Sequence, residues 1–194
     1  MSELDLLLTE IRACTHCAAS LPLGPRPVLS ASTTARVLIV GQAPGTKVHA
    51  SGVPWSDASG RRLREWLGVD EATFYDASRI AIVPMGFCYP GKGKSGDLPP
   101  RPECRQLWHS RLLPLMPQVE LVLAIGQYAQ AYFLGAQRKA DLTATVRAWR
   151  EYSPRCIPLP HPSPRNQAWL KQNPWFAEEV LPELRACVAH ALTR

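Results

Sequence analysis

Four of the six cysteines have spacings typical of metal ligands. Cys14 and Cys17 form a C-x-x-C pair, and Cys88 and Cys104 flank a loop rich in Gly, Pro and Lys. Cysteines spaced in this way hold zinc or iron–sulfur clusters in proteins of reducing compartments. We therefore expect these four side chains to form one ligand set that joins the N-terminal segment to the middle of the chain.

A second group of reactive residue types lies in two loops punctuated by Gly and Pro. The first loop begins with Gly41 to Gly45 and runs through His49 to Trp55 and Asp57, and the second covers residues 161–166. A histidine, a carboxylate, an amide and an aromatic ring can together build a polar reaction centre with an aromatic wall. These loops therefore predict a site that is separate from the cysteines.

The elements that must position these loops are short apolar runs that end in loop signals. Such runs are typical of buried strands, and the segments between them have helical periodicity. Alternating strands and helices predict an α/β fold with a mostly parallel sheet, in which sites lie beyond the carboxyl ends of the strands. The four predicted strands are Arg36–Val40, Arg79–Met85, Leu121–Ile125 and Arg155–Leu159.

The helical segments carry their own start and break signals. Ser59 is a plausible N-cap for a helix that places Leu63, Trp66 and Leu67 on one face. A last helix is entered through Asn173 and Pro174, and Pro182 is expected to kink or split it.

The composition is that of an ordinary globular protein. Hydrophobic residues make up 46% of the 194 residues and charged residues 20%. No apolar run is long enough to cross a bilayer, and the amphipathic start lacks the features of a signal peptide. We expect a cytoplasmic monomer with no membrane contact and one domain over residues 1–194. The net charge of +6 would help it approach a polyanion.

Several motifs, taken in their order along the chain, resemble the uracil-DNA glycosylase superfamily and specifically its iron–sulfur branch. They are the four cysteines, GQAPG from Gly41, the G-x-P-W segment ending at Trp55, VLAIGQYAQA from Val122 and HPSPRN from His161. The resemblance covers nearly the whole chain. It implies a three-layer α/β/α fold with a central four-stranded parallel sheet, the removal of a damaged base from DNA, and a 4Fe–4S cluster with a structural role.

The resemblance also assigns roles to the loop residues. Gly41, Ala43 and Trp55 would surround a base that has been flipped out of DNA, with the indole ring as a stacking platform. His161 would hydrogen-bond the carbonyl oxygen where negative charge collects on the leaving base. The minor-groove segment would comprise Ser163, Pro164, Arg165 and Asn166.

The chain departs from its relatives where water is positioned. Gln42 stands where iron–sulfur relatives commonly have an acidic residue, and an amide can orient water but cannot accept its proton. His49 and Asp57 are the candidates to share the task with Gln42. Asp57 is equally well interpreted as an N-cap.

A second departure concerns base recognition. Pro84 stands where relatives often have an asparagine that reads uracil, and proline has no side-chain donor or acceptor. Main-chain groups of Met85, Gly86 and Phe87 are the predicted substitutes. Uracil is the expected base, and hypoxanthine or xanthine is the alternative.

The loop from Tyr89 to Asp97 is rich in Gly and Lys but lacks the spacing and the following helix of a P-loop. We therefore expect no nucleotide cofactor. Lys92 and Lys94 are interpreted either as contacts to DNA phosphates or as a solvated surface.

Three classes of function follow from these observations. The favoured class is a monofunctional DNA glycosylase that acts on DNA containing a damaged base. The alternatives are an electron-transfer iron–sulfur protein and a zinc-stabilised nucleic-acid-binding module without catalysis.

Overall fold

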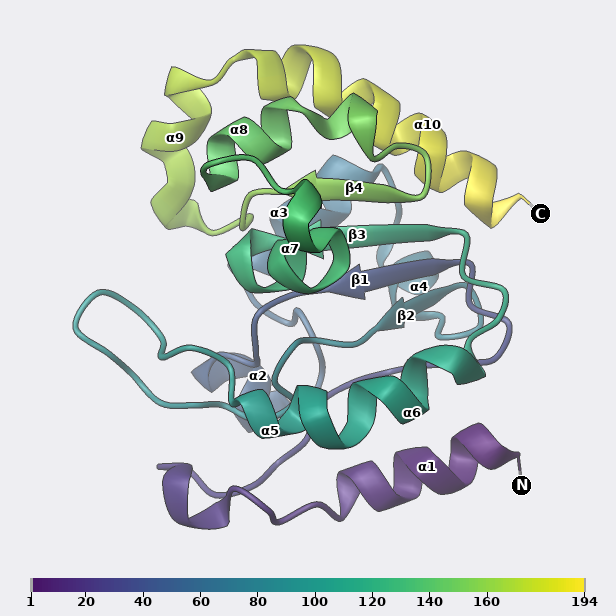
Figure 1. The fold of residues 1–194 in the computed structure, drawn as a ribbon, viewed down its shortest axis with the longest axis vertical. Helices are drawn as coiled ribbons and strands as arrows, with labels where there is room; N and C mark the ends of the chain where they lie inside the picture. Colours follow the sequence, from purple (N-terminus) through teal and green to yellow (C-terminus); the bar gives the residue numbers. More distant parts are fainter. Residues whose placement is uncertain (1, 194) are drawn as a thin grey trace.

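The computed structural model describes residues 2–193, and a four-stranded parallel sheet lies at its centre (Figure 1). The strands are β1 (Val37–Val40), β2 (Ile80–Ile82), β3 (Leu121–Ile125) and β4 (Cys156–Leu159), in the spatial order β2-β1-β3-β4. All three pairings are parallel. The chain order changes direction between β1 and β3, which is the kind of point where α/β proteins place their sites.

Ten α-helices are assigned within residues 2–193, and several are joined to short 3-10 or π-helical turns. Arg105–His109 (η2) and Phe176–Val180 (η7) have π-helical geometry. The α-helices are α1 (Glu3–Arg12), α2 (Thr46–Ser51), α3 (Ala58–Leu67), α4 (Glu71–Tyr75), α5 (Pro102–Cys104), α6 (Ser110–Leu112), α7 (Gly126–Leu134), α8 (Leu142–Arg147), α9 (Gln167–Gln172) and α10 (Leu181–Leu192).

Each face of the sheet is covered by its own hydrophobic core. One core packs Ile39 and Leu123 against α3, α8 and α10, and the other packs Leu38 and Ala124 against α1, α6 and α7. Successive strand residues point to opposite faces, so a strand buried on both sides is apolar throughout, as β1 is. The predicted three-layer α/β/α fold with a central four-stranded parallel sheet is confirmed.

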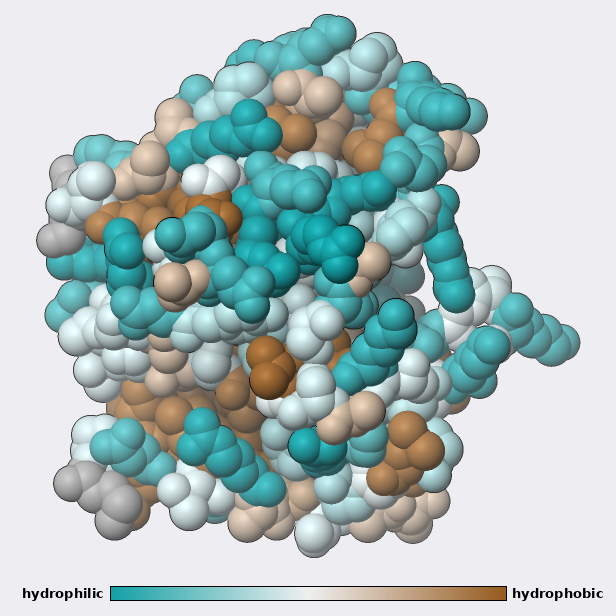
Figure 2. All heavy atoms as spheres, turned by 180° about the vertical axis from the view of Figure 1, so that it is seen from behind, coloured by the Kyte–Doolittle hydropathy of each residue, from teal (hydrophilic) through white to brown (hydrophobic). Residues whose placement is uncertain are grey.

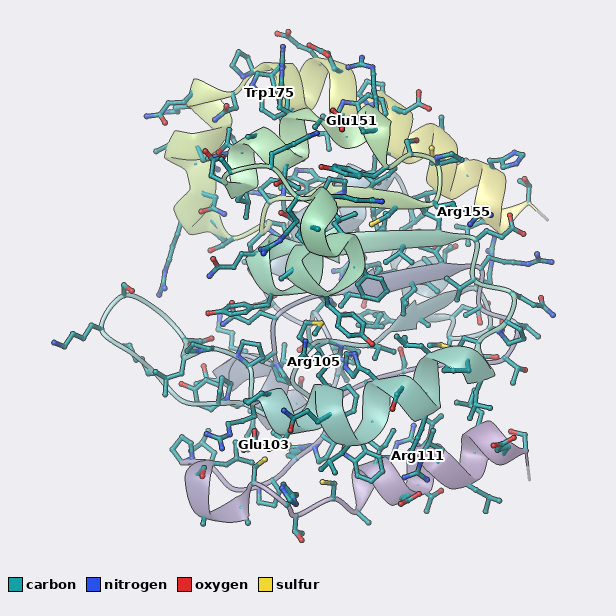
Figure 3. All side chains as sticks on the ribbon, in the orientation of Figure 1. Glu103, Arg105, Arg111, Glu151, Arg155 and Trp175 are labelled. Atoms are coloured by element: carbon teal, nitrogen blue, oxygen red, sulfur yellow. The ribbon has the colours of Figure 1, made fainter. Side chains whose placement is uncertain are left out.

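The N-terminal helix is fixed to the layer beneath the sheet. Ser2 and Asp5 form a capping box at the start of α1, and Leu4, Leu7 and Leu8 are buried on its inner face. Arg111 on α6 reaches across to Glu10, with 2.6 Å between Nη2 and Oε2 (Figure 3). The segment that carries Cys14 and Cys17 therefore starts from a packed helix.

The structure changes three details of the expected elements. β2 ends at Ile82, although Val83 and Met85 still donate hydrogen bonds to Ile39 and Gly41, and Pro84 between them is tolerated because its missing N–H would point away from β1. Helix α3 is capped by Asp57 and not by Ser59. Pro182 lies in the first turn of α10, which follows directly on the π-helical η7, so the helix changes from π to α geometry next to this proline.

No helix among the described residues is long and apolar enough to cross a membrane.

Candidate functional site

A cavity of about 510 Å³ opens at the carboxyl ends of β1, β2 and β4. The loop after β1 contributes Gly41, Gln42 and Ala43, and the loop after β4 contributes His161. These three residues, which were predicted from the sequence as site residues, therefore line the same cavity as the predicted histidine. The sheet brings them together because parallel strands end at one edge.

His161 lies at the wall of this cavity against an aromatic ring. Its imidazole centroid is 5.5 Å from that of Trp55, with 34° between the planes. Burial lowers the pKa of His161, and the nearby carboxylates of Asp57 and Asp97 partly oppose that shift. The imidazole is therefore neutral at pH 7 and has one ring N–H to donate.

Trp55 is held in a backbone conformation that a bulky residue rarely adopts. Its φ is +56°, and its carbonyl oxygen accepts a hydrogen bond from the hydroxyl of Tyr75 at 3.2 Å. A Cβ added at Gly60 would lie 1.7 Å from that carbonyl oxygen, and one added at Gly41 would lie 2.9 Å from the indole ring. Two glycines therefore make room for the indole and its backbone, and the surrounding structure holds Trp55 in this strained conformation.

Gln42 faces the cavity, but its amide is already engaged. Nε2 donates to the carbonyl oxygen of Leu98 at 2.9 Å, which ties the loop after β1 to the loop after β2. Gln42 and His161 also line a second cavity of about 280 Å³, together with Asn166. The two cavities thus adjoin on either side of these side chains.

Asp57 caps a helix, as one of its two predicted interpretations has it, and its side chain also lines the cavity. Oδ1 accepts the N–H of Gly60 at 3.0 Å, which caps α3, and the side chain lines the main cavity near His161. A carboxylate at a helix N-terminus interacts favourably with the helix dipole. Asp57 is a structural cap that also places negative charge at the site.

The structure does not bring His49 into the cavity. His49 lies on α2, its ring faces Tyr89 at a centroid distance of 6.4 Å, and its Nδ1 is buried without a hydrogen-bond partner among the described residues. Among the lining residues of the main cavity, α2 contributes Thr46, Lys47 and Val48. The expected share of His49 in water positioning has no geometric support.

The predicted main-chain readers Met85, Gly86 and Phe87 also lie outside the cavity. Their N–H groups already donate to the carbonyl oxygens of Gly41 and Gln42 and to the Cys104 sulfur, at 2.9, 2.9 and 3.4 Å. These N–H donors fix the chain after β2 and are not available to a ligand, so the structure lends no support to base reading by them. Pro84 does line the cavity.

Ser59 and Asp97 are among the cavity residues that were not predicted as site residues. Ser59 is buried in the first turn of α3, and Asp97 comes from the loop between β2 and α5. Ser59 had been assigned as a cap, and Asp97 had been regarded only as the end of a lysine-rich loop. The signal that could have found Asp97 is its place after the second strand, where the carboxyl-end rule applies equally.

The segment after β4 is ordered by its own side chains. The Ser163 hydroxyl accepts the N–H of Arg165 at 3.2 Å, and the Asn166 amide donates to the carbonyl oxygen of His161 at 2.7 Å. Ser163 and Arg165 line the main cavity, whereas Pro164 is exposed beside them. The segment holds His161 in place and presents a cation at the rim.

Lys92 and Lys94 are exposed on a hairpin-like loop that projects from the molecule (Figure 1). Lys92 and Asp97 form an isolated antiparallel bridge at its base. Seen from behind, hydrophilic side chains extend from this side of the molecule (Figure 2). The two cations therefore lie on the same loop as the cavity residue Asp97.

All four predicted cysteine ligands line one small pocket away from the cavity, and all four are free thiols. Burial raises the pKa of Cys104 to about 12, and the charges of the other three cysteines add to that shift, which shows their mutual proximity. No group of three or more His, Cys, Asp or Glu side chains within residues 2–193 is arranged to hold a metal ion.

The donor set around this pocket nevertheless suits thiolate ligation. The N–H of Phe87 points at the Cys104 sulfur, and the Arg101 side chain hydrogen-bonds Cys17. N–H groups directed at sulfur stabilise ligating thiolates. Two buried side-chain atoms here, Arg101 Nε and Glu103 Oε2, have no partner among the described residues, and Glu103 is seen next to sulfur atoms in Figure 3.

Fold and cavity together define the class: a parallel α/β protein with a polar, aromatic-walled site at the carboxyl ends of its strands. The family model of the uracil DNA glycosylase superfamily matches residues 29–185. The chain belongs to the uracil DNA glycosylase superfamily.

A solved structure resembles the chain in fold. It is a solution NMR structure of a protein from Methanosarcina acetivorans that is proposed to be a uracil DNA glycosylase. The two share 17% sequence identity, the match covers 85% of this chain and 98% of that one, and the TM-score is 0.48.

Proposed function

We propose that this protein is a monofunctional DNA glycosylase that hydrolyses the N-glycosidic bond of a deaminated base, with uracil as the first candidate. The observation that carries the proposal is the pairing of Trp55 with a half-buried His161, whose pKa is lowered, in one cavity at the strand ends. Membership of the superfamily supports it.

The cavity suits a base that has left the duplex. Its volume of about 510 Å³ falls within the range of small-molecule sites. Extruding a nucleotide costs about a few kcal/mol of lost stacking, and stacking on an aromatic ring returns about 1–3 kcal/mol. Trp55 is the ring that can supply this contact, since two glycines hold its indole at the cavity.

His161 can serve the departing base. Cleavage leaves negative charge on the base and positive charge on the sugar, so a donor placed at the base lowers the barrier most. A neutral imidazole donates its ring N–H to a carbonyl oxygen without bringing a competing charge into a buried site. Asp57 and Asp97 line the same cavity, and carboxylates there would stabilise positive charge on the sugar.

Which base the protein accepts depends on the groups that take the place of the asparagine that reads uracil in relatives. Pro84 offers no polar atom from its side chain, and its carbonyl oxygen is engaged by the His109 ring at 3.1 Å. The hydroxyl of the buried Ser59 lines the cavity and can, like an asparagine side chain, both donate and accept a hydrogen bond. A reader of that kind favours uracil but does not strongly reject hypoxanthine or xanthine.

The experiment for this proposal is a single-turnover assay on matched oligonucleotides. Each carries one uracil, hypoxanthine or xanthine in single-stranded and double-stranded form, and alkali-labile abasic sites are counted. We expect release of at least one of these bases, with uracil fastest. Tight DNA binding with no abasic site on any substrate would favour the non-catalytic binding module instead.

We also propose that Cys14, Cys17, Cys88 and Cys104 hold a 4Fe–4S cluster, as in the iron–sulfur branch of the superfamily. The cluster would supply cross-linking of the N-terminal segment to the loop after β2 and not the chemistry of cleavage. The support is that all four free thiols line one pocket at a distance from His161.

The cofactor proposal is tested on anaerobically purified protein. We expect broad visible absorption, about four irons per chain, and loss of both in Cys88→Ser, whereas Cys187→Ser keeps them because Cys187 lies outside the pocket. A colourless protein that contains zinc would replace the cluster by a zinc site. A cluster that takes up and releases electrons reversibly, in a protein that releases no base from DNA, would favour the electron-transfer alternative.

A further inference from the structure

The loop after β1 lacks a group that can take a proton from water. Gln42 has an amide, and its Nε2 is used to hold the carbonyl oxygen of Leu98 at 2.9 Å. The remaining Oε1 can accept a hydrogen bond but has no basicity near neutral pH. A glycosylase built on this site needs a carboxylate from another element.

Asp97 is a carboxylate that the fold brings to the cavity from a different strand end. It lies one residue before Leu98, so the hydrogen bond from Gln42 anchors the chain directly beside it. Its Oδ2 lies close to the loop after β1, since a Cβ added at Gly45 would be 3.5 Å away. The side chain lines the same cavity as His161.

The loop that carries Asp97 is closed by backbone hydrogen bonds. Leu98 donates to Gly91 at 2.8 Å, Gly93 donates to Gly96 at 2.6 Å, and Lys92 pairs with Asp97. Arg165 lies on its other side, with Nη1 3.6 Å from the position of a Cβ at Gly96. These contacts fix the backbone that carries Asp97, so the fold itself sets the position of its carboxylate at the cavity.

We infer that Asp97 is the residue that positions and deprotonates the attacking water, with Gln42 as the residue that positions Asp97. This inference rests on the proposed glycosylase function. The water oxygen bonds to C1′ of the deoxyribose, and one water proton passes to the Asp97 carboxylate and then to solvent. The electron pair of the C1′–N bond leaves with the base, whose anion takes up a proton on release.

Asp57 is the competing carboxylate on the same cavity, and its environment suits a different task. Its Oδ1 is committed to the N–H of Gly60 as a helix cap. A base must be free to approach its proton donor and accept from it. The Asp97 carboxylate makes no side-chain hydrogen bond within residues 2–193, so both of its oxygens are available to water.

The test compares Asp97→Asn with Asp57→Asn and with Glu178→Gln, an exposed residue on η7 that gives the same change in charge. Rates are measured under single turnover on the best substrate of the wild-type protein, and DNA affinity is measured separately. We expect Asp97→Asn to slow base release by about 100-fold or more with affinity nearly unchanged, and Glu178→Gln to match the wild type.

A rescue experiment separates chemistry from structure. The variant Asp97→Ala leaves space at the cavity, so added formate should raise its rate and leave Glu178→Gln unaffected. If the wild type is active and Asp97→Asn releases the base at the same rate, the inference is overturned. If only Asp57→Asn loses base release, the water is assigned to Asp57. A wild type inactive on every base would overturn the proposed function, and the inference with it.

Discussion

The chemistry of the cavity depends on individual polar side chains, and these differ in how well the sequence predicts their position. His161 was predictable because it follows a strand and begins the HPSPRN motif. Asp97 was harder to find, because its place after the second strand was the one available signal and its position at the cavity also depends on a hairpin-like loop and on a hydrogen bond from Gln42. His49 is near the motif in sequence, but the structure turns its ring toward Tyr89 and leaves it outside the cavity lining.

His109 provides a residue-scale prediction about stability. It is completely buried, and burial lowers its pKa from 6.5 to about 4. Between these two pH values the unfolded chain binds a proton that the folded protein does not, so stability is full above pH 6.5 and is lost as the pH falls toward 4. The loss amounts to about 3 kcal/mol for 2.5 pKa units.

The matched variant is His109→Gln, which keeps a donor for the Pro84 carbonyl oxygen but cannot titrate. Urea unfolding at pH 7, 5.5 and 4 should show the wild type losing stability more steeply than the variant. Parallel pH profiles would mean that His109 does not link pH to folding.

At the scale of elements, the strands were predictable and the connections less so. Four apolar runs gave the four strands within a few residues, since strands buried on both faces must be apolar throughout. The cap of α3 stayed open between Ser59 and Asp57 because both are good cap residues, and the structure selects Asp57. Only the position of the helix start, fixed by packing of Gly60 on Trp55, separates them.

Gly60→Ala tests how α3 holds Trp55. Helix propensity alone predicts a gain of about 1 kcal/mol for this change in a helix. The added Cβ would instead lie 1.7 Å from the Trp55 carbonyl oxygen, so the helix or the strained residue must shift. We expect a net loss of about 1–3 kcal/mol in the free energy of unfolding.

The control for this prediction is Gly45→Ala, where the new Cβ meets only an ordinary contact at 3.5 Å. Its free energy of unfolding should change by less than about 1 kcal/mol. A stabilised Gly60→Ala protein would show that the close packing on Trp55 does not constrain the helix.

At the scale of the whole molecule, the proposed cluster site and the proposed active site occupy different regions of the fold. The cysteine pocket lies where the N-terminal segment meets the start of α5, and the cavity lies at the strand ends around His161. The segment from Pro84 to Cys88 connects the two, since its N–H groups bond to Gly41, Gln42 and Cys104. The family motifs predicted both regions, but only the fold reveals this shared segment.

The most direct test of the account compares the wild type with His161→Ala on a uracil-containing oligonucleotide under single turnover. The wild type should convert the strand to abasic product, and the variant should be slower by about 100-fold or more while binding DNA with nearly the same affinity. Base release by the variant at the wild-type rate would contradict the central claim that the Trp55–His161 cavity is a glycosylase active site.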